Sequence, residues 1–220
     1  MTRHSVIVKE VLGEVVYRRT KATEERKKAR RRLLLDAATR LFGKRGYHAT
    51  TVPMIVAEAN SSTGSFYMYF RNKEDVFNAA LEELGQAVLG ILADVRGSQP
   101  DPLKRISQAL EALFLYLAHK PARARILIVE SSGLSPRLEK TRRAILRQLA
   151  EEVRHTIEAE PAAFQVENNT IAARCVVGAA FEALCCWLEE DPKSRLPAKD
   201  VARAVARFDI QAVKKVSTKS

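Results

Sequence analysis

Apolar residues recur along most of the chain at the three- and four-residue spacing of amphipathic helices, whereas no strand or hairpin pattern follows residue 20. Thr23 is a suitable N-cap for the first helix, because acidic residues follow it in the first turn. Apolar positions then continue to Phe42, and Gly46 supplies a C-terminal stop. The pattern therefore predicts an all-α protein.

The segment before this helix does not fit a single secondary structure. Residues 1–20 are rich in β-branched Val and Ile, yet their apolar positions also allow a helical spacing. The segment could be a docked strand, a short helix or a disordered arm. We therefore treat residues 1–22 as an N-terminal extension of undefined structure.

Two short helices separated by a tight turn are predicted next. Thr50 or Thr51 can cap the first of them, Val52–Ala59. Asn60 suits the left-handed conformation that the turn requires, and the second helix then runs over Ser62–Phe70 with Ser62 as its N-cap. Two helices joined in this way form a helix-turn-helix motif.

The rest of the chain reads as a helical body. A long helix opens at Asn72 or Lys73, and the sequence at 97–102 ends it. Further amphipathic stretches, separated by prolines, lie at 103–119, 122–131, 136–158, 168–190 and 197–213. About nine helices are expected in total.

Charge divides the chain into two parts. The whole sequence carries 37 Lys and Arg against 26 Asp and Glu, a net charge of +11. Residues 1–80 alone hold 16 basic and 8 acidic side chains, whereas the remainder is nearly balanced. A basic end joined to a nearly neutral body is typical of a nucleic-acid-binding segment attached to a separate domain.

Several other classes of protein are disfavoured. No uninterrupted apolar run approaches the ~18 residues that span a bilayer, so no membrane segment is expected and a cytoplasmic location is predicted. The three cysteines share one apolar segment, where reduced cysteine is usually a buried hydrophobe. No cofactor and no metal are predicted, because no Cys or His cluster has ligand spacing. An enzyme is disfavoured because nothing resembles a nucleophile–base pair or a glycine-rich phosphate loop.

One run of residues is highly specific. It consists of Gly46-Tyr47, Thr50-Thr51-Val52, Ile55, Ala59, Ser62, Gly64, Phe66-Tyr67, Tyr69-Phe70 and Lys73-Glu74. Residues 33–77, which contain this run, resemble the DNA-binding domain of TetR-type transcriptional regulators. The resemblance implies a three-helix helix-turn-helix domain followed by a helical ligand-binding and dimerisation domain. The expected boundaries are 1–22 for the extension, 23–75 for the DNA-binding domain with its helix-turn-helix at about 52–71, 76–213 for the body and 214–220 for a tail.

The resemblance also implies roles in DNA binding. In such regulators the first turn of the second motif helix faces the major groove, which assigns base contacts to Thr63, Gly64 and Ser65. Phosphate contacts fall to surrounding side chains, namely Thr51, Tyr67, Tyr69 and Lys73, together with Arg30 and Arg31 of the basic segment 18–32.

Three residues depart from the usual family pattern. Asn60 and Ser61 stand where the family usually has Gly and Val, and Val56 stands where it usually has Ala. Ser61 removes an apolar plug and Val56 adds volume at a helix crossing. We therefore expect a small change in the angle between the motif helices.

Members of this family dimerise through their last two long helices, which correspond here to 168–190 and 197–213. The residues expected at the dimer interface are Val177, Phe181, Leu184, Leu188, Val205 and Phe208. An effector pocket is expected between the preceding helices, lined by Leu84, Val88, Leu110, Phe114, Leu117, Leu127 and Phe181. Five arginines could bind an acidic effector, but we expect them to be surface charges: Arg123, Arg125, Arg137, Arg142 and Arg143.

The leading hypothesis is a dimeric, sequence-specific repressor that an unknown small apolar effector releases from a twofold-symmetric DNA operator. Redox sensing through Cys185 and Cys186 is a weaker hypothesis of the same class, because adjacent helical cysteines do not pair easily. An architectural DNA-binding protein without an effector is the alternative, and an all-helical enzyme is the least favoured reading.

Overall fold

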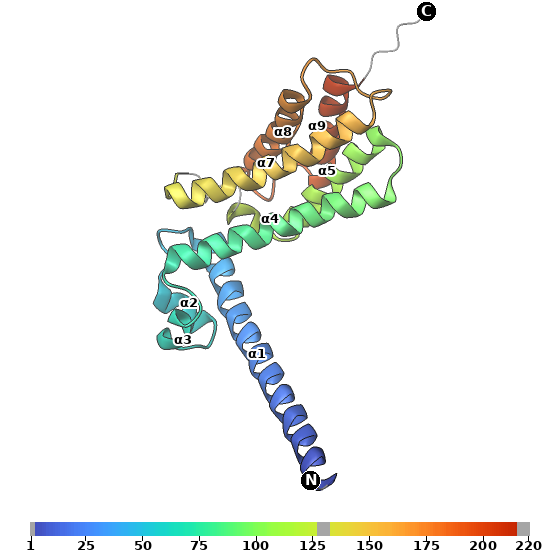
Figure 1. Ribbon diagram of the computed structural model, residues 1–220. Helices are drawn as coiled ribbons and strands as arrows, with labels where there is room; N and C mark the ends of the chain where they lie inside the picture. Colours follow the sequence, from blue (N-terminus) through green and yellow to red (C-terminus); the bar gives the residue numbers. More distant parts are fainter. Residues whose placement is uncertain (1–2, 127–132, 215–220) are drawn as a thin grey trace, which may run out of the picture.

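The computed structural model describes residues 3–126 and 133–214, with side chains from residue 23 onward, and Figure 1 shows it as a ribbon. Nine α-helices account for most of these residues, and the described part of the chain contains no β-strand. Their bounds are α1 Arg3–Arg45, α2 Val52–Glu58, α3 Thr63–Tyr67, α4 Lys73–Ser98, α5 Pro102–Ala118, α6 Pro121–Arg125, α7 Pro136–Ala159, α8 Asn169–Glu189 and α9 Ala198–Val213. The predicted all-α class is confirmed.

The first helix is much longer than the sequence pattern predicted. α1 runs without interruption from Arg3, so Thr23 lies in its interior and is not an N-cap. Neither Gly nor Pro occurs between Glu14 and Phe42, so nothing forces a break at Thr23. Residues 3–20, for which a strand, a helix and a disordered arm were considered, are helical. The helix continues past residue 22, where the N-terminal extension was expected to end. The N-terminal half of α1 projects away from the rest of the molecule (Figure 1).

A small aromatic core holds the N-terminal domain together. Phe42 of α1, Ile55 of α2 and Phe66 of α3 are fully buried in it, as is Phe77 of α4. The rings of Phe42 and Phe77 meet edge to face with their centroids 5.0 Å apart. Each large buried side chain stabilises such a core by ~1.5–3 kcal/mol, so four of them fix the short α2 and α3 against the longer helices.

The C-terminal body is a helical bundle entered through α4. α4 packs against α5 and α7, α7 against α8, and α9 mainly against α5. Asp101 caps α5 by accepting hydrogen bonds from the backbone N–H of Leu103 and Lys104, both at 3.0 Å. Of the stretch expected at 122–131, residues 122–125 lie in the short α6, and residues 127–132 lie outside the described part of the chain.

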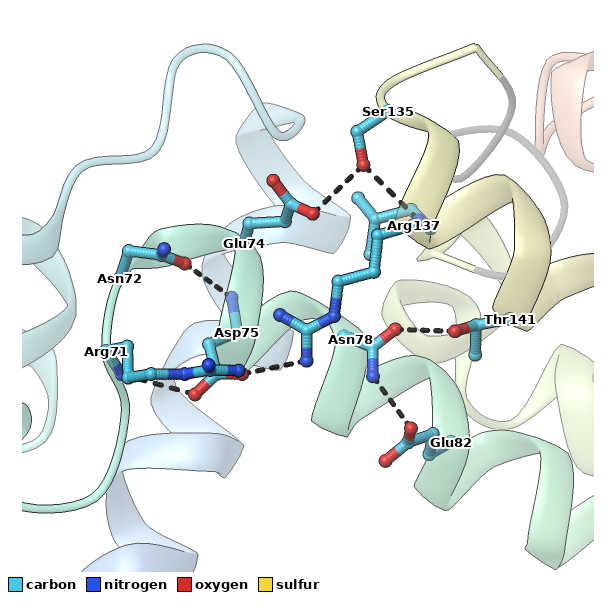
Figure 2. Close-up of polar contacts among 10 residues, drawn as sticks. Arg71, Asn72, Glu74, Asp75, Asn78, Glu82, Ser135, Arg137 and Thr141 are labelled. Atoms are coloured by element: carbon cyan, nitrogen blue, oxygen red, sulfur yellow. Dashed lines mark hydrogen bonds and ion pairs between the residues drawn. The ribbon is translucent and has the colours of Figure 1, made fainter.

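Polar contacts between α4 and α7 join the two domains (Figure 2). Arg137 and Arg71 both donate to Asp75, at 2.9 and 3.2 Å, and Thr141 donates to Asn78 at 2.7 Å. Burial raises the pKa of Asp75, but the hydrogen bonds from the two arginines outweigh that effect and lower it to about 2. This carboxylate therefore remains charged, and it holds the start of α4 against α7.

Two helices, α4 and α8, are long and apolar enough by length and composition to cross a membrane. Neither helix is an uninterrupted apolar run, because a few polar residues are scattered along each of them. Core helices of soluble proteins meet the same criterion. Both helices pack here within the bundle, so their composition is weak support for a membrane segment.

Candidate DNA interface and effector cavity

The helix-turn-helix is built by local hydrogen bonds that the sequence predicts. Thr51 Oγ1 accepts from the Met54 N–H at 3.4 Å, and Ser62 Oγ accepts from the Ser65 N–H at 3.1 Å. Asn60 adopts the left-handed conformation with φ of 45°. Because both helix starts and the turn are fixed in this way, α2 and α3 hold a defined relative orientation. α3 ends at Tyr67, three residues earlier than expected.

The first turn of α3 is open to solvent. Thr63 and Gly64 are exposed, Ser65 is half-buried, and Phe66 beneath them is fully buried. A Cβ placed at Gly64 would meet only Ser62 Oγ, at 4.0 Å, so packing within this chain does not require glycine there. A surface of small polar residues held on a rigid base is suited to close approach of a nucleic-acid groove.

The candidate phosphate contacts differ in how available they are. Thr51 is exposed and Tyr67 is 56% exposed, whereas Tyr69 is half-buried against the core. Lys73 is engaged within the protein: its Nζ donates to the Tyr47 carbonyl at 2.8 Å and lies 4.2 Å from the centroid of the Tyr47 ring. Burial lowers the pKa of Lys73. Thr51 and Tyr67 are therefore the most accessible candidates around α3.

The basic segment of α1 is only partly neutralised. Lys27 and Lys28 form ion pairs with glutamates one turn earlier, and Arg32 pairs with Glu83 at 2.8 Å. Arg30 is exposed and has no ion pair or hydrogen bond among the described side chains. The Arg31 guanidinium lies 5.1 Å from the centroid of the Phe70 ring. Arg30 and Arg31 thus keep free donors beside the helix-turn-helix.

The departures from the family pattern leave a local defect. Ser61 Oγ is buried without a hydrogen-bond partner among the described residues, and Val56 is 8% exposed. An unpaired buried hydroxyl destabilises a fold by ~1–3 kcal/mol. The expected change in the angle between α2 and α3 stays a prediction.

A cavity of about 120 Å³ lies in the C-terminal body between α4, α5, α7 and α8. Of the residues predicted to line it, Val88, Leu110, Leu117 and Phe181 do so. Leu84 and Phe114 are buried in the core but do not line the cavity. Leu127 lies outside the described residues.

Sequence reasoning missed one end of the cavity. The apolar stripe of α4 continues one turn beyond Val88 to Leu92, and α7 contributes apolar side chains that were not singled out. Polar side chains gather at the same end, namely Arg96, Arg105, Glu152 and Thr156. Arg96 donates to the Glu152 carboxylate, and Arg105 donates to two backbone carbonyls at 3.0 Å.

The five arginines considered for an acidic effector do not line this cavity. Four of them form ion pairs elsewhere: Arg123 with Glu83 at 3.3 Å, Arg137 with Asp75 at 2.9 Å, and Arg142 and Arg143 with Glu139 at 2.9 and 2.8 Å. These pairs support the interpretation that they are structural or surface charges.

The dimer-interface prediction needs correction on α8. Leu184 and Leu188 are buried inside this chain, and Val177 and Phe181 line the cavity, so this stripe faces inward. The exposed face of α8 carries other residues instead: Ile171, Cys175, Gly178, Glu182 and Cys186. On α9, Val205 is half-buried and Phe208 is 67% exposed. Phe208 thus remains available to a second chain.

The cysteines are less buried than the sequence suggested. Cys175 and Cys186 are exposed and Cys185 is half-buried, because they follow the outer side of α8. Loss of solvation raises the pKa of the Cys185 and Cys186 thiols, with Glu189 and Glu182 adding to the effect. A raised pKa disfavours the reactive thiolate. No group of side chains within the described residues has the arrangement of a metal site.

α6 connects the cavity-bearing body to the DNA-binding domain. It packs against α1, where a Cβ added to Gly43 would lie 2.3 Å from the Ala122 Cα. Arg123, also on α6, forms ion pairs with Asp36 of α1 and Glu83 of α4 at 3.6 and 3.3 Å. A movement of α6 would therefore be transmitted directly to α1.

Comparison with known proteins agrees with this arrangement. Residues 34–80 match the family described as bacterial regulatory proteins, tetR family. The transcriptional regulator HbdR of Aromatoleum sp. strain CIB is 42% identical over 55 residues, which are 25% of this chain and 24% of HbdR. The transcriptional repressor KstR2 of Mycolicibacterium smegmatis is 30% identical over 107 residues, which are 49% of this chain and 52% of KstR2. The chain thus spans about half or less of the length of these relatives.

The fold is shared over a longer stretch. The transcriptional regulator FadR of Bacillus subtilis, solved in complex with stearoyl-CoA, superimposes with a TM-score of 0.72 at 19% identity, covering 81% of this chain and 96% of FadR. The family match lies in the helix-turn-helix domain, and the structural match extends to the helical body. The relatives are regulators of transcription. Residues 34–80 thus form a DNA-binding domain of the tetR family of bacterial regulatory proteins, and the helical body shares the fold of such regulators.

Proposed function

We propose that this protein is a homodimeric, sequence-specific repressor that binds a twofold-symmetric DNA operator and leaves it when a small apolar effector binds the body. It would act in the cytoplasm, associated with the nucleoid. The observation that carries the proposal is the exposed first turn of α3, with Thr63 and Gly64 presented on a fully buried base. Short polar side chains in that position read base edges in other helix-turn-helix proteins.

The cavity favours an effector-responsive protein over an architectural DNA-binding protein. Its walls are almost entirely apolar. Two of the helices that line it, α5 and α8, contact α6, and α6 packs against α1. The similar fold of a regulator solved with stearoyl-CoA also supports an apolar ligand. An effector that binds one arrangement of the body more tightly shifts the population toward that arrangement, and operator affinity falls by the same coupling.

Thr63→Ala is expected to change which operator is preferred while non-specific affinity stays nearly constant. Loss of one base contact costs ~1–3 kcal/mol at one or two base pairs, because the first turn of a recognition helix points at base edges. The measurement is selection of binding sites from random duplexes by the wild type and the variant. An identical twofold-symmetric site with identical base preferences would show that Thr63 does not read bases.

Arg30→Gln is the comparison for this experiment, because Arg30 is exposed on α1 away from the first turn of α3. Its loss should weaken binding to all sequences alike and reduce the dependence of affinity on salt by about one ion for each subunit of the dimer. A change in base preference at Arg30 would instead assign part of the readout to α1.

Phe208→Glu is expected to give monomers at micromolar concentration. Phe208 is the largest apolar side chain exposed on α9, and a buried unpaired charge at an interface weakens association by ~2 kcal/mol or more, about 30-fold. Sedimentation equilibrium measures the effect. Leu196→Glu is the matched control, since Leu196 is 63% exposed in the loop before α9. If both variants dimerise as strongly as the wild type, the interface does not include Phe208.

A further inference from the structure

The exposed surface of α3 continues beyond its first turn. The Met68 N–H donates to the Gly64 carbonyl at 3.3 Å, so Met68, the C-cap of α3, lies one turn after Gly64. Residues three and four positions apart share one side of a helix, which places Tyr67 and Met68 on the side of Gly64. Tyr67 is 56% exposed and Met68 is 74% exposed. We call Gly64, Tyr67 and Met68 the outer face of α3.

Met68 is not needed to hold α3 in place. Phe66 and Phe70, two residues away on either side, are buried in the core and fix this segment. Met68 is the most exposed of the large apolar side chains that the structure describes. Single exposed apolar residues are common on soluble proteins, so exposure alone assigns no role to Met68. Its position does, because Met68 lies one turn from Gly64 on the helix that we propose enters the DNA major groove.

The chemistry of the Met68 side chain limits what it can contact in that groove. A thioether has no hydrogen-bond donor and is only a weak acceptor, so it cannot bind phosphate oxygens or distinguish bases by hydrogen bonds. It is flexible and polarisable, and it fills irregular apolar spaces. In the major groove the 5-methyl group of thymine is the apolar feature that distinguishes this base. The thymine methyl group is therefore the complementary partner for Met68.

Gly64 gives Met68 access to the bases. A Cβ placed at Gly64 would meet only Ser62 Oγ, at 4.0 Å, so the fold itself does not require glycine there. Without a side chain at Gly64, the backbone of α3 can approach the base edges closely. One helical turn advances by about 5.4 Å, and successive bases of one strand are about 3.4 Å apart. Met68 thus reaches a base one or two steps away from the base nearest to Gly64.

We propose that Met68 reads a thymine of the operator through apolar contact with the 5-methyl group of the base. This proposal rests on the proposed function, since it assigns a further specificity residue to the same DNA-binding helix. Thr63 and Met68 read bases by different chemistry, the first through a hydrogen bond and the second through burial of a methyl group. Burial of one methyl group changes affinity about fourfold, and the two half-sites of the operator together change it about 15-fold.

The test compares thymine with deoxyuridine, which lacks only the 5-methyl group and keeps every hydrogen-bonding group. The operator is the site that the wild type selects from random duplexes, and each thymine is replaced in both half-sites at once. Fluorescence anisotropy with the full-length protein measures the affinity. We expect one position at which deoxyuridine weakens wild-type binding about 15-fold. Met68→Ala should lose this preference for thymine, whereas Met68→Leu, which keeps an apolar side chain, should retain most of it.

Leu196→Ala is the matched control, because Leu196 is also a large exposed apolar residue and lies in the loop before α9. It should keep the full preference for thymine. An equal preference in Met68→Ala and the wild type would overturn the assignment, as would wild-type binding that no deoxyuridine weakens. In both cases specific binding of the selected operator would still support the proposed function. Failure to select any site would instead contradict sequence-specific DNA binding itself.

Discussion

At pH 8 the Asp209→Asn variant is expected to be more stable than the wild type, by up to about 4 kcal/mol. Asp209 lies on the inner side of α9 and is 1% exposed, and its Oδ2 has no hydrogen-bond partner among the described residues. Burial raises the pKa of Asp209 from 3.8 to about 7. An ionised carboxylate in this position is unsolvated and unpaired, whereas an amide of the same shape carries no charge.

The pH range over which the stability of the wild type changes follows from the direction of the pKa shift of Asp209. Between about pH 4 and pH 7 the carboxyl of Asp209 ionises in the unfolded chain but stays protonated in the folded one. Raising the pH through this window therefore lowers wild-type stability, by ~1.4 kcal/mol per unit for a full proton. The stability is retained below pH 4 and its loss is complete above pH 7. The stabilisation of the variant should increase over the same range and then level off.

Urea denaturation at pH 4.5, 6 and 8 measures the difference in the free energy of unfolding. Asp200→Asn is the matched control, since Asp200 is exposed on the same helix. This variant is the reference for removing a carboxylate from the exposed side of α9. A difference for Asp209→Asn that does not change with pH would show that the folded protein stabilises the ionised Asp209 side chain.

Asp209 also shows what an apolar pattern does not reveal. On α9 the sequence singled out Val205 and Phe208, as residues of the dimer interface, and did not assign the side that packs within the chain. The buried positions are Ala198, Ala202, Ala206, Asp209 and Val213. Small side chains let α9 approach α5 closely, and this packing encloses the carboxylate that follows them. Size and hydrophobicity alone did not identify the inner face.

The helix-turn-helix was predictable because its geometry depends on adjacent residues. Thr51, Ser62 and Asn72 each cap a helix with a side-chain oxygen three residues before the bonded N–H, and Asn60 takes the left-handed turn position. Such contacts are fixed within one turn of chain. Thr23 has the same chemistry but no break before it, and the helix continues through that position.

The cavity and the faces of α8 depend on contacts between distant segments. Apolar residues occur on several sides of α8, so the sequence alone did not distinguish the inward stripe with Leu184 from the outward one with Ile171. On α4 the correct stripe was chosen, but Leu84 lies one turn away from the cavity and Leu92 lines it. Whether Leu84 or Leu92 lines the cavity depends on where along α4 the helices α5 and α7 cross it.

Gly43→Ala is expected to destabilise the protein by ~1–3 kcal/mol and to weaken the coupling between the body and the DNA-binding domain. The added methyl group would lie 2.3 Å from the Ala122 Cα and 2.5 Å from its carbonyl oxygen, so α6 has to move away from α1. Urea denaturation measures the first effect. Gly97→Ala is the control, because a Cβ there meets nothing within 4 Å, and a helical Gly→Ala change at such a site stabilises by ~0.5–1 kcal/mol.

A second substitution distinguishes a backbone clash from a side-chain clash. If only the Ala122 methyl group opposed the new Cβ, which it would meet at 2.4 Å, Ala122→Gly would restore the stability of Gly43→Ala. Since the Ala122 Cα and carbonyl oxygen are equally close, we expect the double variant to stay as unstable as the single one, or less stable. Full recovery would show that α6 and α1 are separated far enough for side chains alone to control the contact. Operator affinity should then again respond to a ligand in the body.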